Sequence, residues 1–266
     1  MKSPAGACLS ADRVFWYDRN MDNLLKQWKN EERALFKGWD FSYLKNRTTS
    51  DKLPWNYEKI AKKLVQKSRA VLDMGTGGGE LFSSFGPFPG RAVAIENYPP
   101  NVKEARKKLK PLGVKVIKAN EAKKLPFKNE EFDLVLNRHS AFHAKEVFRI
   151  LRKNGIFFTQ QVDGTDLTDL ADEFKAKKQW PFWTLEYAKD KLIKAGFKIE
   201  KATKWSGKKE FKDVGAIVYF LKAVPWTVKG FNVDKYLSNL QKLQKKLDSG
   251  QKLIFTIKRF LIKAKK

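Results

Sequence analysis

The feature that most constrains this chain is a short apolar run that ends in an acid and breaks into glycines. The run is Ala70 to Leu72, the acid is Asp73, and glycines stand at positions 75, 77, 78 and 79. An unbroken apolar run of this length is typical of a strand buried on both faces of a parallel sheet. Because glycine tolerates positive φ and lets backbone N–H groups approach a ligand, the segment predicts a strand that leads into a nucleotide-binding loop.

The spacing of the glycines separates two classes of cofactor. A dinucleotide fingerprint needs a third glycine at position 80, where this chain has Glu80. The pattern Asp73-x-Gly75-x-Gly77-x-Gly79 instead resembles the first motif of the class I S-adenosylmethionine-dependent methyltransferases. An acid at the end of the strand suits the ammonium group of a methionine moiety and would repel a pyrophosphate. A glycine-rich turn that binds no ligand is the alternative explanation of this motif.

Three later segments follow in the order that this family shows. A second predicted strand, 91–95, ends in Glu96, about twenty residues past the glycines, where an acid can accept from both ribose hydroxyls. A third, 114–119, precedes residues 120–127, which are similar to an Asp-Ala-x-x-Leu-Pro-Phe stretch of small methyltransferases, with Glu121 in place of the aspartate. A fourth strand, 132–137, is followed by a helix and a fifth strand within 143–158.

Nearly the whole chain resembles the type 11 methyltransferases, stand-alone bacterial and archaeal proteins with no settled substrate. The resemblance implies a Rossmann-like α/β fold with a seven-stranded, mostly parallel sheet, its last strand antiparallel, and helices on both faces. It also implies S-adenosylmethionine as the cofactor, and Glu121 as the acid that contacts the adenine amino group. The cofactor-binding residues implied are Asp73, Gly75, Thr76, Gly77, Gly79, Glu96, Asn97, Glu121, Ala122 and Asn137.

The chain divides into three predicted parts. Residues 1–54 form an N-terminal helical cap, irregular over 1–18 and helical over 20–36; residues 55–224 form the cofactor-binding core, with an insertion at about 163–195; and residues 225–266 form a C-terminal helix and tail packed on the core. The last two strands of the sheet are expected at 197–204 and 214–222, and the apolar tail 253–262 is expected to pack on the core.

The methyl acceptor is expected where the fourth strand ends, because ligands of open α/β sheets bind outside the carboxyl ends of the strands. This places Asn137, Arg138 and His139 beside the transferred methyl group as candidate catalytic residues. His139 is a candidate base for an oxygen or nitrogen acceptor, since histidine takes up a proton near neutral pH. Alternatively, it only shapes the loop by hydrogen bonds. Arg138 would hold an anionic acceptor or lie on the surface.

Some chemistries do not fit the sequence. An Asn/Asp-Pro-Pro-Tyr/Phe box, the mark of adenine amino methylation, is missing after the fourth strand. The only cysteine is Cys8, in a segment expected to be loose, so a cysteine nucleophile for cytosine C5 and a cysteine-based metal site are both unexpected. No apolar stretch is long enough to span a membrane, and the amino terminus lacks an apolar signal region. We therefore expect a cytoplasmic enzyme without a metal.

The formal charge of +26 raises the question whether the methyl acceptor is a nucleic acid. It comes from 44 lysines and 11 arginines spread along the chain, whereas a recognition surface for nucleic acid favours arginine. Aromatic side chains in the flanking segments would close over a planar substrate or only pack these segments onto the sheet: Trp39, Trp55, Trp180, Trp183 and Trp226. We predict methylation of an O or N atom of a small molecule. The alternatives are an RNA methyltransferase and a pseudoenzyme that keeps the cofactor fold as a scaffold.

Overall fold

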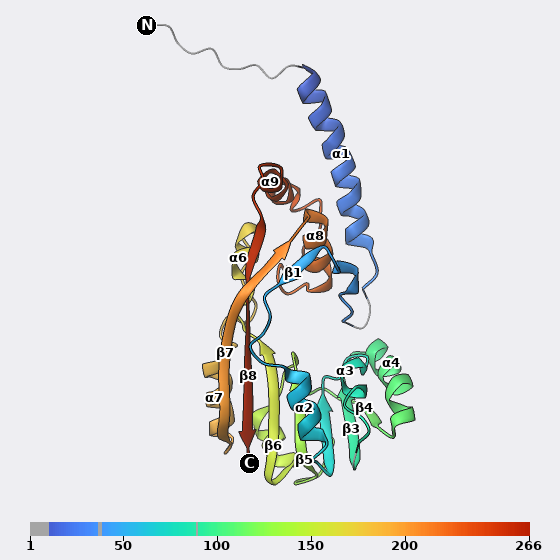
Figure 1. Cartoon of the computed structure of the whole chain (residues 1–266), viewed down its shortest axis with the longest axis vertical. Coiled ribbons are helices and arrows are strands. Elements are labelled where there is room, and N and C mark those ends of the chain that lie inside the picture. Colours follow the sequence, from blue (N-terminus) through green and yellow to red (C-terminus); the bar gives the residue numbers. More distant parts are fainter. Residues whose placement is uncertain (1–10, 37–38, 89) are drawn as a thin grey trace.

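The structure is a computed structural model that describes residues 11–36, 39–88 and 90–266. These residues form one eight-stranded sheet with helices packed around it (Figure 1). Cys8 lies outside the described residues. The strands are β1 (Thr48–Ser50), β2 (Ala70–Met74), β3 (Arg91–Glu96), β4 (Lys115–Lys118), β5 (Phe132–Arg138), β6 (Leu151–Val162), β7 (Lys198–Phe211) and β8 (Leu253–Lys265). The α-helices are α1 (Ala11–Arg33), α2 (Tyr57–Val65), α3 (Glu80–Ser83), α4 (Pro99–Leu109), α5 (Ala144–Ile150), α6 (Thr168–Glu173), α7 (Leu185–Lys194), α8 (Val214–Ala223) and α9 (Leu237–Asp248).

The sheet has the strand order β1-β7-β8-β6-β5-β2-β3-β4. Strands β2 to β6 run parallel to their neighbours in this group, and β8 pairs antiparallel with both β6 and β7. The predicted Rossmann-like fold, mostly parallel with the last strand antiparallel, is thereby confirmed. The strand count is eight rather than seven, because the short β1 adds to the edge of β7.

Strands β2, β3 and β5 have apolar central residues because both of their faces are buried. Leu72, Val93 and Val135 belong to a core on one face, to which α5 and α7 contribute. Val71, Ala94 and Leu136 belong to a core on the other face, to which α2, α3 and α4 contribute. This two-sided burial is the reason why the sequence shows continuous apolar runs rather than alternation.

A third core lies beyond the carboxyl ends of the parallel strands. It is built by α1, α6, α8 and α9 around the far half of the antiparallel β7–β8 pair, which extends past the rest of the sheet (Figure 1). Trp28 of α1, Leu240 of α9 and Phe255 of β8 are buried in it. We call this unit the upper lobe. It brings segments from both ends of the chain to the edge where a ligand is expected.

The prediction of a strand at 214–222 is wrong, since these residues form helix α8. A short, fully apolar run fits a buried helix as well as a buried strand, and Val214 to Tyr219 are indeed all buried. The side chain of Asp213 accepts a hydrogen bond from the backbone N–H of Ala216 at 2.7 Å, which caps the helix at its start. An aspartate three residues before a helical N–H is an N-cap signal, and it points away from a strand.

Two further predictions change at the ends of the chain. Helix α1 begins at Ala11, although residues 1–18 were expected to be irregular. The tail 253–262 does not merely pack on the core, because it lies inside the sheet as β8, between β6 and β7. The antiparallel strand that the fold requires is thus supplied by the tail rather than by residues 214–222.

Candidate active site

Three acids line one edge of the sheet because they end three neighbouring strands. Asp73 lies near the end of β2, Glu96 ends β3, and Glu121 follows β4. The glycine loop after β2 is fastened to β3, since the N–H groups of Gly75 and Thr76 donate to the carbonyl of Ile95 at 3.0 and 3.1 Å. The sheet therefore brings together the acids that the sequence predicted for the cofactor.

The glycine loop has a backbone that favours glycine. Gly77 and Gly79 have φ values of +61° and +83°. A Cβ on Gly79 would lie 2.9 Å from Cγ of Leu109, so the absence of a side chain lets the loop pack against α4. A Cβ on Gly77 would meet only Trp39, at 3.7 Å from its Cδ1. Gly77 therefore presents bare backbone, as a loop that approaches a ligand should.

The carboxylate of Glu96 holds the loop in place. Oε2 accepts from the N–H of Gly77 at 2.8 Å, and Oε1 accepts from the N–H groups of Asn97 and Tyr98 at 2.8 and 2.9 Å. Glu96 is 8% exposed. Oε2 accepts one hydrogen bond and has a second acceptor position, so Glu96 can still accept from a hydroxyl group of a ligand.

Two polar atoms beside the loop have no partner among the described residues. They are Oγ1 of Thr76 and Oε2 of Glu121, both buried. The other oxygen of Glu121 accepts a hydrogen bond from the hydroxyl of Ser140. Oγ1 of Thr76 lies close to the carboxyl group of Asp73, whereas the free oxygen of Glu121 can accept a hydrogen bond from a ligand. With the acids at the strand ends, this oxygen fits a cofactor that carries an ammonium group, ribose hydroxyls and an adenine amino group.

The carboxyl group of Asp73 has a raised pKa of about 7. Burial is the main cause of the rise, and repulsion by Glu96 adds to it, while the hydroxyl of Thr76 and the charge of Arg138 act in the opposite direction. A cation bound beside Asp73 would favour its ionised form and lower this pKa. The site is thus suited to a ligand with a positive charge at this position.

The side chain of Asn137 ties three strands together at the acceptor end. Its Nδ2 donates to the carbonyl of Met74 at 3.3 Å, and its Oδ1 accepts from Thr159 at 2.9 Å and from Gln161 at 2.5 Å. Asn137 is fully buried. These bonds fix the ends of β2, β5 and β6 relative to one another, which positions the residues that follow in β5.

A chain of hydrogen bonds joins Trp55, Gln160 and His139. The indole Nε1 of Trp55 donates to Oε1 of Gln160 at 2.7 Å, and Nε2 of Gln160 lies 2.9 Å from Nε2 of His139. Because indole is only a donor, the amide of Gln160 must turn its NH₂ group toward His139. Nε2 of His139 is then an acceptor, and its ring is neutral with the proton on Nδ1.

The electrostatic surroundings of His139 agree with a neutral ring. The protein packed around His139 lowers its pKa well below the ordinary value although the side chain keeps contact with solvent, and the positive charges of Arg259 and Arg138 lower it further. The residue also has a positive φ of 55°. Its backbone N–H donates to the carbonyl of Gln160 at 2.8 Å, so the loop is held to β6 at this point.

Aromatic side chains from the two ends of the chain meet above the glycine loop. Trp39, from the segment between α1 and β1, lies over Gly77, and its ring centroid is 5.5 Å from that of Trp226, which follows α8. Trp39 also contacts Phe36 and Phe41. The upper lobe therefore covers part of the edge at which the cofactor residues gather.

Sequence reasoning placed most of these residues but missed others. Asn97 and Ala122, both predicted to bind the cofactor, lie at the same edge with exposed side chains. Ser140 was not predicted to bind, although it links Glu121 to residues 139–143, the loop after β5 that we call the acceptor loop because the sequence predicts the acceptor beside it. Nor was Tyr57, which stacks on Phe158 with ring centroids 4.9 Å apart. Its position two residues after Pro-Trp gave no signal of this contact.

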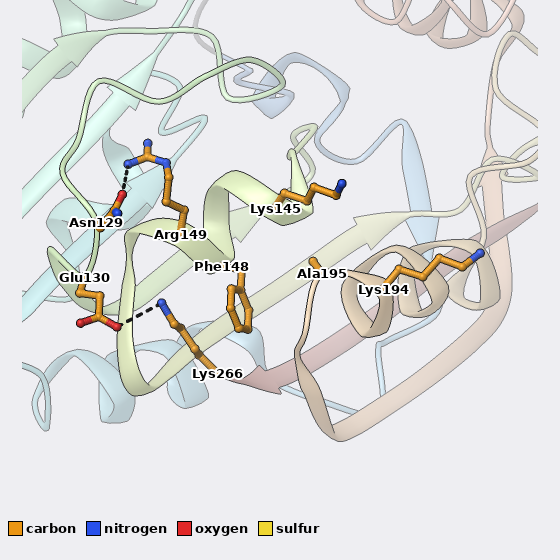
Figure 2. A pocket seen from close by; sticks show the side chains of 8 residues that line it. All are labelled: Asn129, Glu130, Lys145, Phe148, Arg149, Lys194, Ala195 and Lys266. Atoms are coloured by element: carbon orange, nitrogen blue, oxygen red, sulfur yellow. Dashed lines mark hydrogen bonds and ion pairs between the residues drawn. The ribbon is translucent and has the colours of Figure 1, made fainter.

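A separate cavity of about 560 Å³ lies at the opposite edge of the sheet (Figure 2). It is lined by Asn129, Glu130, Lys145, Phe148, Arg149, Lys194, Ala195 and Lys266. Arg149 is already bound to Glu146 and Asn129, and Lys266 lies 3.4 Å from Glu130. Because these charges are paired and the cavity is near the amino ends of β5 and β6, it does not belong to the site.

The described residues contain no cluster of three or more His, Cys, Asp or Glu side chains that could hold a metal ion. Within the same residues, every helix is too short or too polar to cross a bilayer.

Comparisons with known proteins agree with this geometry. A family model for a methyltransferase domain, of type 11, matches residues 72–159, which run from β2 through the acids and the acceptor loop into β6. No sequence among curated proteins matches the chain.

Solved structures share the fold. A candidate methyltransferase of Bacillus halodurans is 21% identical, with a TM-score of 0.55, over 78% of this chain and 97% of the other. The YcgJ protein of Bacillus subtilis is 17% identical, with a TM-score of 0.54, over 79% and 97%. A protein of unknown function from Deinococcus radiodurans is 14% identical, with a TM-score of 0.56, over 92% and 98%. The segment that holds the glycine loop and the acids thus matches a methyltransferase domain, and the chain shares the fold of the solved structures.

Proposed function

We propose that the enzyme methylates an oxygen or nitrogen atom of a small molecule bound where β5 and β6 end. The observation that carries this proposal is the cover over the strand ends. Trp39 lies on Gly77 and meets Trp226, while Trp55 reaches Gln160 at the end of β6. A site covered by side chains from both ends of the chain suits a small acceptor better than a polymer.

We propose that Asp73, Glu96 and Glu121 hold the cofactor with the glycine loop. S-adenosylmethionine supplies an activated methyl group on its sulfonium. Since the donor is reactive, the protein contributes mainly by positioning. Ser140 supports this role, because its hydroxyl binds Glu121 and ties the cofactor residues to the acceptor loop.

His139 has two possible roles toward the acceptor, and its hydrogen bonds favour one of them. With Nε2 accepting from Gln160, the group that faces away from Gln160 is Nδ1–H, which is a donor. We propose that His139 orients the acceptor through this donor. The base predicted from the sequence needs the lone pair of Nε2, so proton removal by His139 requires Gln160 to release it.

The test is a methyl-transfer screen with S-adenosylmethionine labelled in the methyl group. The full chain is incubated with separate small-molecule and RNA fractions, and the Gly77→Val variant serves as the inactive control. We expect label in a small molecule with the wild-type chain only. Label found solely in RNA would overturn the proposed acceptor, and no binding of S-adenosylmethionine in calorimetry would favour the pseudoenzyme.

The charge of +26 favours RNA as the second candidate. However, exposed lysines occur on elements at both edges and both faces of the sheet, and do not gather at the acceptor loop. Examples are Lys59 and Lys63 of α2, Lys103 and Lys107 of α4, Lys201 and Lys204 of β7, and Lys242 of α9. An RNA substrate predicts binding that weakens steeply between low and physiological salt. Undetectable or salt-independent binding would exclude it.

A further inference from the structure

Cationic side chains from three strands lie on one face of the sheet, beside the proposed acceptor position. Arg138 of β5 pairs with Gln160 of β6, and Val162, two residues further along β6, pairs with Arg259 of β8. Because side chains alternate between the faces of a sheet, Arg138, Gln160 and Arg259 share one face. The guanidinium of Arg138 lies 5.9 Å from the ring centroid of Tyr57, which confirms the face.

Strand β7 adds a third cation to this face. Trp205 pairs with Arg259, and Lys209 follows four residues later, so its side chain points to the same side. The ammonium group of Lys209 lies 5.3 Å from the ring centroid of Phe211 and 6.0 Å from that of Phe220. Lys209 is only half-exposed. Three cations from parts of the chain that are far apart in sequence therefore lie on one face of the sheet.

Of these three cations, Arg259 is paired with an acid, and the other two are not, within the part of the chain that the structure describes. Nη1 of Arg259 donates to Oδ1 of Asp166 at 2.5 Å, and Asp166 also accepts from the N–H of Lys258 at 2.6 Å. Within the described residues, neither the side chain of Arg138 nor Nζ of Lys209 has a hydrogen bond or an ion pair. Lys209 is half-buried, and a half-buried cation without a partner is unfavourable, while Arg138 is exposed and able to bind a ligand, so this arrangement suits a bound anion.

The charges of these side chains affect one another's pKa values. Burial and the charge of Arg259 lower the pKa of Lys209, while Asp166 opposes this effect. Arg259 also lowers the pKa of His139, as Arg138 does. An anion placed among them would be attracted by all three cations and would lie beside His139.

We propose that Arg138, Arg259 and Lys209 bind a carboxylate or phosphate group of the methyl acceptor. The inference rests on the proposed function, because it takes the acceptor to lie at the ends of β5 and β6. Arginine suits these anions, since its planar fork can bind two oxygens at once, and lysine adds a point charge. The acceptor is thus a small anionic molecule, held by its charged end and presented to the cofactor.

The experiment titrates inorganic phosphate and, separately, acetate into the full chain, with and without S-adenosylhomocysteine. The probe is the imidazole NMR signal of His139, which is easily assigned because the chain has only two histidines. We expect a saturable shift of this signal and a rise in the pKa of His139 when the anion binds. A stronger response to phosphate or to acetate identifies the anionic group.

Matched variants make the outcome specific. Lys209→Met and Arg138→Met should each weaken the binding of the anion about tenfold, which corresponds to the loss of one charged contact. Lys201→Met, which removes an exposed lysine of the same strand, should titrate like the wild type. The proposal is overturned if the His139 signal does not respond, or if both variants bind the anion as tightly as the wild type.

Binding of S-adenosylhomocysteine is measured by calorimetry in the same samples, and separates the two proposals. If the cofactor product binds and the anion does not, the anion site is wrong and the proposed function stands. If the anion binds specifically and S-adenosylhomocysteine does not, the anion site is supported and the proposed function fails.

Discussion

At the scale of single residues, the glycine loop offers the sharpest test of the cofactor site. A valine at position 77 would place a branched side chain on a backbone with φ of +61°, in the space over which Trp39 lies. We expect Gly77→Val to abolish binding of S-adenosylmethionine in calorimetry. The strain itself costs about 1–2 kcal/mol of folding free energy, so the variant should still fold.

Gly113→Val is the matched control for this variant. Gly113 also has a positive φ, +75°, and a Cβ there would meet nothing within 4 Å. The control carries the same kind of strain away from the site. If both variants kept the wild-type affinity, residue 77 would not belong to the cofactor site.

Asp73 gives a prediction about pH. Its pKa is about 7 in the folded chain and near 3.8 when unfolded, so the folded state binds more protons between these values. The contribution of Asp73 to stability is therefore fully present below pH 3.8 and is lost as the pH rises through 7. We expect Asp73→Asn to melt at a higher temperature than the wild type at pH 8, with a smaller difference at pH 5.

The measurement is thermal unfolding of both proteins across this pH range, without ligand. Calorimetry with S-adenosylmethionine accompanies it. The uncharged asparagine should no longer attract the ammonium group of the cofactor, so the affinity should also fall. A difference in melting temperature that does not depend on pH would mean that Asp73 titrates normally.

At the scale of elements, helix α8 shows how a local signal decides between two structures. Asp213 caps α8 and also pairs with Arg47, at 2.6 Å between Nη2 and Oδ1. We expect Asp213→Ala to destabilise the protein by about 1 kcal/mol through the lost cap, with a further loss from the unpaired Arg47. Urea unfolding measures this change.

Asp213→Asn is the companion variant, because asparagine can still cap a helix but cannot form the ion pair. We expect it to fall between the wild type and Asp213→Ala. Equal stability of all three proteins would show that neither the cap nor the pair holds the upper lobe in place.

At the scale of the whole molecule, the upper lobe reaches the cofactor loop through Trp39. If this contact helps to hold the cofactor, Trp39→Ala should weaken the binding of S-adenosylhomocysteine by on the order of tenfold, with little change in the melting temperature of the protein. Trp39 is 48% exposed, so its removal leaves only a small cavity. Calorimetry measures the affinity.

Trp180→Ala is the control, since Trp180 is similarly exposed, at 52%, and lies in the segment between α6 and α7. It should bind S-adenosylhomocysteine like the wild type. Equal affinity of the Trp39 variant and this control would mean that the upper lobe does not contribute to cofactor binding. The division of the chain into parts at residues 54 and 224 stays a prediction.

The sequence by itself determined the class of fold, and it predicted that the glycine loop and three acids lie together at one edge of the sheet. These features depend on short segments: an apolar run followed by alternating glycines, and an acid at the end of each of the next strands. Local signals of this kind can be recognised from the sequence alone, because the carboxyl ends of parallel strands always meet at one edge of the sheet. Asp73, Glu96 and Glu121 could therefore be placed together without a structure.

Only the tertiary structure decided how the rest of the chain is used. The apolar run at 214–222 fits a helix or a strand equally, and its burial on all sides within the upper lobe selected the helix. The partner of β6 turned out to be the tail, which lies almost a hundred residues further on. The meeting of Arg138, Arg259 and Lys209, and of Trp39 with Gly77, depends on the path of the chain through the upper lobe. Contacts between distant segments are set by packing, and no local pattern encodes them.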